Sequence, residues 1–362
     1  MTLNRRLAAA AALSALTLGL AACGASTRPA DGSLHADISG AGASSQGKAQ
    51  EAWFDTFMVA NDHVIITYNP VGSGGGRQQF MAGAVDFTGS DAPLKPSELD
   101  RARARCLGTE ALELPLYISP IAVFYNVPGF AADNHINMSP DVIADVFNGT
   151  ITSWDDARIA ALNPGAALPK LKIVPVHRSD ESGTTKNFQA YLAKVAPTQW
   201  PHKAEETWPI EGGQSGDGTS GMVATVAAAS GAIGYADASR VTPELGTVAV
   251  GADGHFTPFT AQAAAATIDA SELADDATDL RLVYDLRTDV PGTYPIVLVS
   301  YLIACSRYED PDVAATVKAY LAFIASEEGQ QIAADPNVAG AAPISPALRA
   351  KVDAAIAQIV TD

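Results

Sequence analysis

The sequence predicts an α/β protein, because short apolar runs of strand length alternate with amphipathic stretches of helical spacing. The 362 residues are 48% hydrophobic, which is enough for one large domain or two medium ones with proper cores. We find no repeat of fixed period, so a repeat architecture is not expected.

Each element follows from its local pattern. Helical spacing of apolar residues follows Gln46 and again Ser182. The Ala-rich stretch 261–266 fits a helix or a loop. Four apolar runs read as strands, at residues 64–68, 118–125, 171–176 and 296–304. Two C-terminal helices are expected, at residues 313–324 and 351–360.

The first 22 residues predict an export signal. Two arginines precede an apolar run at residues 7–20, which is too short to span a membrane. The Leu-Ala-Ala-Cys sequence ending at Cys23 resembles the bacterial lipobox and implies lipidation of Cys23; the alternative is an ordinary signal peptide with a chance cysteine. Residues 23–33 suit a tether. Since no second long apolar run follows, we expect a mature protein held at the membrane only by lipid.

The composition limits the partners. The formal charge is −17, and it becomes −19 once residues 1–22, which carry two arginines and no acid, are removed. Such an acidic protein disfavours nucleic acid and anionic lipid surfaces as partners. A small anion would therefore have to be held by local dipoles and hydrogen bonds.

Cys106 and Cys305 are expected to form a disulfide in an oxidising compartment, with two buried thiols as the alternative. Two thiols and six scattered histidines predict neither a metal site nor a cofactor.

Gly/Ser/Thr-rich clusters precede four of the helical patterns. The first amides of a helix lack internal partners and lie at the positive end of its dipole. Glycine lets an oxyanion approach the backbone, and serine or threonine adds a hydroxyl donor. One such cluster is more often a capped helix start, but several on one chain favour a shared anion site. The clusters lie at residues 40–45, 72–76, 179–185 and 216–221.

Three letter patterns suggest other ligands and fail in their context. Residues 42–48 read G-x-x-x-x-G-K, but Ala49 stands where a nucleotide P-loop needs Ser or Thr, so Lys48 is expected to be a solvated side chain. Residues 216–221 match a dinucleotide fingerprint, but residues 211–215 predict no strand leading into it. Residues 45–48 read S-x-x-K without the K-T-G or S-D-N partners of a penicillin-binding enzyme, and no G-x-S-x-G elbow occurs.

Arg178 carries the strongest local signal for an anion. It follows an apolar strand, and open α/β sheets bind ligands at the carboxyl ends of their strands. An arginine fork beside the helix start at residues 182–184 makes a receptor for a tetrahedral oxyanion. The alternative is a surface ion pair with Asp180 or Glu181. Asp91 is out of place beside an anion, and on its own it reads as a turn or N-cap residue.

Five segments together resemble the phosphate-binding protein of the bacterial Pst-type ABC importer: GAGASS, YNPVGSGGGRQQF, VDFTGSDAPL, VHRSDESGTTKNF and SGAIGYAD. The resemblance covers residues 38–344. It implies the two-lobed periplasmic-binding-protein (Venus flytrap) fold with a hinge of two crossovers. Such a protein would close over inorganic phosphate and deliver it to transmembrane permease subunits without catalysis. It also implies a first lobe of residues 34–126 plus 294–362, which would contain both Cys106 and Cys305, and a second lobe of residues 127–293.

The resemblance also implies the site. Asp91 would accept the proton of the phosphate itself, which fully deprotonated sulfate cannot offer, so Asp91 would act as a specificity device. Around the anion the donors would be amides, hydroxyls and one guanidinium: Ser44 (hydroxyl and amide), Ser45 (amide), Ser73 (hydroxyl), Arg178 (held by an acid such as Asp180), Ser182 (hydroxyl and amide), Gly183 (amide) and Thr184 (amide and hydroxyl).

Two features leave questions open. Many members of the family have Phe where this chain has Ser45; if the amide makes the contact, the side chain should matter little beyond excluding water. Within residues 216–221, Thr219 or Ser220 would either line the cleft or cap a helix.

Two other functions also stay open: a secreted phosphatase-like hydrolase, and a surface adhesin or signalling lipoprotein on the same scaffold.

Overall fold

A computed structural model describes residues 33–131, 135–286, 290 and 293–361. The expected signal peptide, the lipidation at Cys23 and nearly all of the 23–33 tether lie outside the described residues. The chain divides into Met1–Ser33 and Leu34–Asp362, and the following description concerns only the second unit.

In this unit the described strands form one eleven-stranded sheet, with a separate two-stranded pair. The main path runs β2-β1-β3-β13-β4-β8-β6-β7, and β9 joins it through β4 and carries β5 and β10. β1 pairs in parallel with β2 and β3, and β13 is antiparallel to both β3 and β4. The α/β prediction and the two-lobed fold are confirmed.

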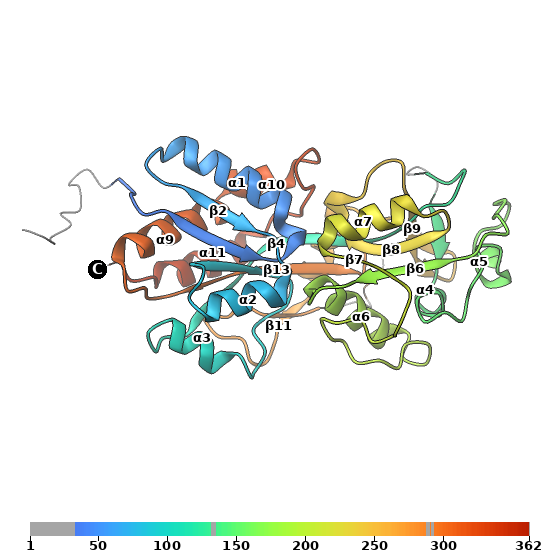
Figure 1. Ribbon diagram of the computed structural model, residues 1–362, viewed down its shortest axis with the longest axis horizontal. Coiled ribbons are helices and arrows are strands. Elements are labelled where there is room, and N and C mark those ends of the chain that lie inside the picture. The colour runs from blue at the N-terminus through green and yellow to red at the C-terminus, as the bar shows by residue number, and fades with distance from the viewer. Residues whose placement is uncertain (1–32, 132–134, 287–289, 291–292, 362) are drawn as a thin grey trace, which may run out of the picture. The chain divides into compact units, whose positions relative to one another are not determined.

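The first lobe is built on the first half of this path. Figure 1 shows α1 and α2 on opposite sides of its strands. The strands are β1 (Ile38–Gly42), β2 (Ile66–Asn69), β3 (Phe87–Ser90), β4 (Ala111–Tyr125) and β13 (Val297–Cys305). The helices are η1 (Ser44–Gln46), α1 (Gly47–Ala60), α2 (Ser73–Met81), α3 (Leu99–Arg105), α9 (Pro311–Ala325), α10 (Glu327–Ala334) and α11 (Pro346–Ala357).

The second lobe repeats the arrangement, with α7 and α6 on opposite sides of its strands (Figure 1). Its strands are β5 (Ile136–Met138), β6 (Val174–Arg178), β7 (Gln214–Gly216), β8 (Ala232–Asp237), β9 (Gly246–Ala252) and β10 (His255–Thr257). Its helices are α4 (Pro140–Phe147), α5 (Ala157–Leu162), α6 (Gly183–Val195), α7 (Gly218–Ala228) and η2 (Ala238–Arg240). Two further elements follow along the chain, α8 (Ala261–Asp269) and the pair β11 (Glu272–Leu273) with β12 (Tyr284–Asp285).

The continuous strand β4 joins the two halves of the sheet. It pairs with β13 up to Pro120 and with β8 from Ile121 onward. Later in the chain, Arg281 forms an ion pair with Glu113 of the first half of β4, although the resemblance implies that residues 127–293 belong to the second lobe. The division of the chain between the lobes therefore stays a prediction.

The predicted elements exist, with shifted ends. The run at 171–176 becomes β6, which ends at Arg178, so Arg178 is the last residue of its strand. The expected helix at 351–360 is α11, which begins at Pro346 because Ser345 caps it, its hydroxyl accepting the Leu348 N–H at 3.2 Å.

Trp53 in the first lobe and Trp154 in the second are fully buried in the hydrophobic core. The Trp53 indole N–H donates to the Gly329 carbonyl at 2.6 Å, and that of Trp154 donates to the Gly231 carbonyl at 3.0 Å. The predicted disulfide between Cys106 and Cys305 is present and ties the end of α3 to the end of β13. The alternative of two free thiols is therefore excluded.

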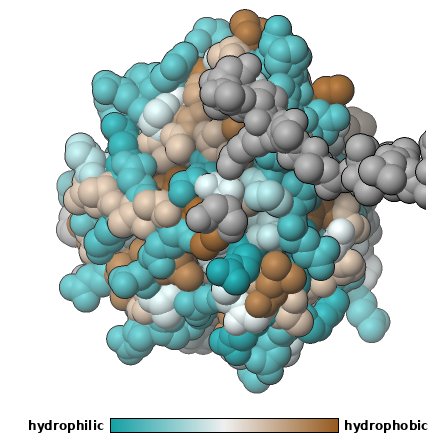
Figure 2. All heavy atoms as spheres, turned by 90° about the vertical axis from the view of Figure 1, so that its left-hand side faces the viewer, coloured by the Kyte–Doolittle hydropathy of each residue, from teal (hydrophilic) through white to brown (hydrophobic). Residues whose placement is uncertain are grey.

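The end of the molecule at the left of Figure 1 is mostly hydrophilic, with separate hydrophobic spots (Figure 2). Among the described residues, the large apolar side chains that stand exposed are Val59, Ile65 and Leu107. No helix in the described part of the chain is long and apolar enough to cross a membrane.

Candidate functional site

Three segments of the first lobe bring polar side chains to the carboxyl ends of its parallel strands. Ser44 and Ser45 begin η1 one residue after β1, Ser73 begins α2 after β2, and Asp91 follows the last residue of β3. All four side chains are buried. Because the carboxyl ends of parallel strands meet at one edge of a sheet, residues spread over almost fifty positions lie together.

The Asp91 carboxylate accepts three hydroxyl hydrogen bonds. Its Oδ1 accepts from Ser45 Oγ and from Ser300 Oγ, each at 2.6 Å, and its Oδ2 accepts from Thr184 Oγ1 at 2.7 Å. Its backbone N–H donates to Ser73 Oγ at 3.1 Å. A hydroxyl that accepts through its oxygen keeps its proton for another acceptor.

Burial raises the pKa of the Asp91 carboxyl above its ordinary value. The hydroxyls of Ser300 and Ser45, that of Thr184, and the positive charge of Arg178 act in the opposite direction and favour the charged form. The carboxylate is therefore a strong acceptor enclosed by donors.

Arg178, the last residue of β6, faces this group from the second lobe. Its Nε donates to Asp180 Oδ1 at 2.7 Å, and its Nη2 donates to Ser44 Oγ in the first lobe at 3.1 Å. The ion pair with Asp180 that was predicted as an alternative does form, but Arg178 is only 4% exposed. Asp180 therefore fixes a buried guanidinium rather than a surface one.

The start of α6 lies against the first lobe. Ser182 is its N-cap, and the Ser182 hydroxyl accepts the Thr185 N–H at 3.2 Å. A Cβ added at Gly183 would lie 2.7 Å from both Asp91 Cβ and Ser73 Oγ, so this position requires glycine for the lobes to approach.

The start of α7 completes the contact and corrects one expectation. A strand does lead into residues 216–221: β7 pairs in parallel with β6, with Gly216 opposite Arg178. The sequence hides β7 because it has only three residues and reads Gln-Ser-Gly. The open question about Thr219 is also answered: it lies at the contact between the lobes, where its N–H donates to Ser44 Oγ at 3.0 Å. The neighbouring Gly218 N–H donates to Asp180 Oδ1 at 3.1 Å. The chain's own oxygens thus occupy these first amides of α7.

Two further expectations change. Lys48 is not simply solvated, because its Nζ donates to the Ser239 carbonyl of η2 at 2.7 Å. Ser45 was expected to matter through its amide, but its hydroxyl holds Asp91. A phenylalanine at this position, which the family resemblance leads one to expect, could not make that bond.

Sequence reasoning missed Ser300. It is the one serine in the apolar run at 296–304, and it is fully buried on β13, where it donates to Asp91 and accepts from Gln46 Nε2 at 2.6 Å. A lone polar residue in a buried strand signals a buried partner, because an unsatisfied hydroxyl in a core is costly. The pattern could have identified Ser300 but not its partner.

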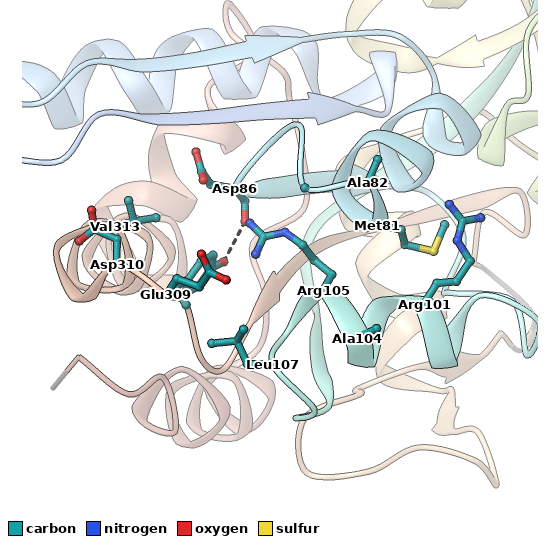
Figure 3. Close-up of a pocket in the computed structure, with 12 residues that line it drawn as sticks. Met81, Ala82, Asp86, Arg101, Ala104, Arg105, Leu107, Glu309, Asp310 and Val313 are labelled. Atoms are coloured by element: carbon teal, nitrogen blue, oxygen red, sulfur yellow. Dashed lines mark hydrogen bonds between the residues drawn. The ribbon is translucent and has the colours of Figure 1, made fainter.

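A separate hollow of about 610 Å³ lies elsewhere on the first lobe, between α3 and the start of α9 (Figure 3). Arg101 and Arg105 line it together with Asp86, Glu309 and Asp310, and none of the predicted site residues contributes. In the described part of the chain, no three His, Cys, Asp or Glu side chains are grouped to hold a metal ion.

A two-lobed α/β fold with polar loops of both lobes meeting between them defines the class of solute-binding proteins. The profile of the PBP superfamily domain matches residues 25–328. Solved structures agree on the fold: a phosphate-binding protein from Stenotrophomonas maltophilia has a TM-score of 0.70 at 19% identity, covering 88% of this chain and 93% of that one. For a putative phosphate ABC transporter substrate-binding protein from Clostridium perfringens, the TM-score is 0.61 at 22% identity, with coverage of 84% and 99%.

Curated relatives narrow the class. Phosphate-binding protein PstS2 of Mycobacterium bovis (strain BCG / Pasteur 1173P2) is 33% identical, with 98% of this chain and 99% of that protein covered. PstS3 of the same strain is 35% identical, with coverage of 89% and 90%. PstS of Methanocaldococcus jannaschii is 31% identical, with coverage of 76% and 75%. The chain belongs to the PstS family of phosphate-binding proteins.

Proposed function

We propose that this protein captures inorganic phosphate between its lobes and delivers it to the permease of an ABC importer. The observation that carries the proposal is the meeting of one buried acceptor, Asp91, with donors from both lobes, among them Arg178 and Ser44. The names of the relatives, PstS2 and PstS3, support the same ligand.

The mixture of one acceptor with many donors suits hydrogen phosphate. Arg178, the Gly183 and Thr184 amides at the start of α6, and the serine hydroxyls would donate to its unprotonated oxygens. The carboxylate of Asp91 would accept its remaining proton. Sulfate near neutral pH has no proton to give, so one of its oxygens would face the carboxylate, and a site built on a required hydrogen bond rejects such an analogue strongly.

The implied contacts would be made by Ser44, Ser45, Ser73, Arg178, Ser182, Gly183 and Thr184. Thr184 Oγ1 lies 2.7 Å from Asp91 Oδ2 and the two come from different lobes, so closure itself brings donor and acceptor together. In the structure the hydroxyls of Ser45, Ser300 and Thr184 hold the carboxylate, and the Ser182 N–H is taken by the Glu206 carbonyl. On this proposal the anion would therefore be served by Arg178, by the remaining amides and by the hydroxyls of the other site serines.

Calorimetry with phosphate, arsenate and sulfate tests the proposal. We expect one phosphate per chain, arsenate binding as well because it has the same proton pattern, and much weaker sulfate binding. Equal binding of phosphate and sulfate, or no phosphate binding, would overturn it; the second result would favour an adhesin or signalling role. Steady release of phosphate from p-nitrophenyl phosphate would favour a hydrolase instead.

We further propose that the protein works at the outer face of the cytoplasmic membrane, held by lipid on Cys23. The lipobox-like sequence that ends at Cys23 supports this placement. Mass spectrometry of the mature N-terminus tests it, and an unmodified terminus at another residue would refute it. Delivery to the permease can be measured as phosphate uptake by cells that lack their own binding protein.

A further inference from the structure

Beside the candidate site, four charged side chains form what we call the interlobe ion cluster: Arg77, Lys95, Glu98 and Glu206. Arg77 lies on α2, and Lys95 and Glu98 lie between β3 and α3, so these three belong to the first lobe. Glu206 lies in the loop between α6 and β7 of the second lobe. Figure 1 shows α2 and α6 on the same side of the sheet.

Arg77 is the centre of the cluster and is fully buried. Its Nη1 donates to Glu206 Oε1 and its Nη2 to Glu206 Oε2, both at 2.7 Å, in a bidentate pair. Its Nε donates to Glu98 Oε2 at 3.0 Å. The planar fork of arginine matches a carboxylate in this way, and such charge-assisted pairs are the strong ones.

Lys95 completes the charge balance. Its Nζ lies 2.6 Å from Glu206 Oε2, and its side chain is 35% exposed. Two cations therefore face two carboxylates, and Glu206 is the one member from the second lobe. When the lobes separate, the first lobe keeps two positive charges and one negative charge, and a desolvated guanidinium loses its best partner.

Glu206 is held rigidly in its own lobe. Gln189 of α6 donates to the backbone carbonyls on both sides of Glu206, to Glu205 at 2.8 Å and to Thr207 at 3.0 Å. Trp208, two residues on, stacks on the His177 ring of β6 at 5.6 Å with an interplanar angle of 2°. The carboxylate is thus presented to the first lobe without a large loss of side-chain freedom.

The cluster is joined to the candidate site on both sides. The Glu206 carbonyl accepts the N–H of Ser182, the N-cap of α6. Arg77 Nη1 also donates at 2.9 Å to Ser90 Oγ, and Ser90 directly precedes Asp91. The same contact between the lobes therefore reaches the Ser90 side chain, next to Asp91, in one lobe and the backbone of Ser182 in the other.

We propose that Glu206, paired with Arg77 and Lys95, is a positioning residue that latches the lobes and sets how long phosphate is retained. The identity of the retained ligand rests on the proposed function, whereas the contact between the lobes does not. The latch forms only when the lobes meet. Removing it should therefore speed the opening of the lobes more than it slows the capture of phosphate. Breaking a buried charge pair across an interface changes mainly the dissociation rate.

The latch stays charged throughout the physiological range. Burial by itself would raise the pKa of Glu206, but hydrogen bonds from Arg77 and Lys95 and their charges outweigh it and hold the pKa at about 2. The contribution of the latch is therefore constant between about pH 5 and pH 8, and it is lost only as the pH falls toward about 2.

The test measures phosphate association and dissociation by stopped flow for wild type and for Glu206→Gln. We expect dissociation to be at least about tenfold faster, with association changed by less than about threefold. Lys95→Gln should act in the same direction but less, because Lys95 is partly exposed. Arsenate should be released faster by the same factor, since the latch does not contact the anion.

Glu205→Gln is the matched control, because Glu205 is the exposed neighbour and contributes only its backbone carbonyl. Small-angle scattering of the phosphate-free protein gives a second readout, in which Glu206→Gln should shift the population toward the open, larger form. Unchanged dissociation and scattering, or equal effects of Glu205→Gln, would overturn the latch. If wild type binds no phosphate, the proposed function fails, and the scattering comparison alone decides the latch.

Discussion

The Asp91→Asn variant tests the selectivity argument most directly. The carboxylate lies 2.6 Å from the hydroxyls of Ser45 and Ser300 and 2.7 Å from that of Thr184, so three donors favour its charged form against burial. Asparagine keeps the size of the side chain but replaces one acceptor oxygen by an amide that can donate. Phosphate should lose one charge-assisted bond, and sulfate should lose one repulsive contact.

The magnitude follows from the cost of each change. A hydrogen bond to a charged group contributes about 1.5–3 kcal/mol, and a buried charged acceptor left facing an oxygen costs a similar amount or more. Together the changes should lower the ratio of phosphate to sulfate affinity by about 3–6 kcal/mol, which is about 150-fold to 25,000-fold.

Calorimetric titration of both anions into wild type and Asp91→Asn at pH 7.5 provides the measurement, with the exposed Asp100→Asn as control. Wild-type selectivity should also decline as the pH falls toward the raised pKa of Asp91, because a protonated carboxyl has lost the charge that repels sulfate and can itself donate to an anion. An unchanged ratio in Asp91→Asn would refute the assignment of selectivity to this residue.

Three further changes have defined outcomes. Arg178→Ala should weaken phosphate binding by about 2 kcal/mol or more, measured by calorimetry, and near-wild-type affinity would remove Arg178 from the site. The double variant Cys106→Ser/Cys305→Ser should lose about 3–5 kcal/mol of unfolding free energy in denaturant titrations, because the bond closes a loop of 199 residues; its phosphate affinity should stay near wild type. Asp237→Asn should stabilise the protein more at pH 7.5 than at pH 4.5. Burial raises the pKa of Asp237 to about 6, so the native state holds a proton that the unfolded state releases, and the unfolding free energy falls by about 3 kcal/mol as the pH rises from about 4 to above 6. Equal effects of Asp237→Asn at both pH values would contradict this sign.

Local patterns in the sequence were enough to predict part of the elements, among them β2, β4, β6 and β13, and the helix starts at the four glycine-rich clusters. The apolar runs predicted the strands because alternation and β-branched composition are local properties. The Gly/Ser/Thr clusters marked helix starts because free amides and caps are also local. Short strands such as β7 escaped, since three residues without a large apolar side chain carry no periodic signal.

What the sequence alone determined, then, is the alternation of strands and helices, the four glycine-rich helix starts, and the chemistry that Asp91 and Arg178 could perform. Only the tertiary structure decided which residues meet: Ser300 with Asp91 across 209 positions, Thr219 with Ser44 across 175, and Glu206 with Arg77 across 129. These contacts depend on how the strands pair and how the two lobes close. Their energies come from burial and from the distance between groups far apart in the chain, and no local pattern of residues encodes either quantity.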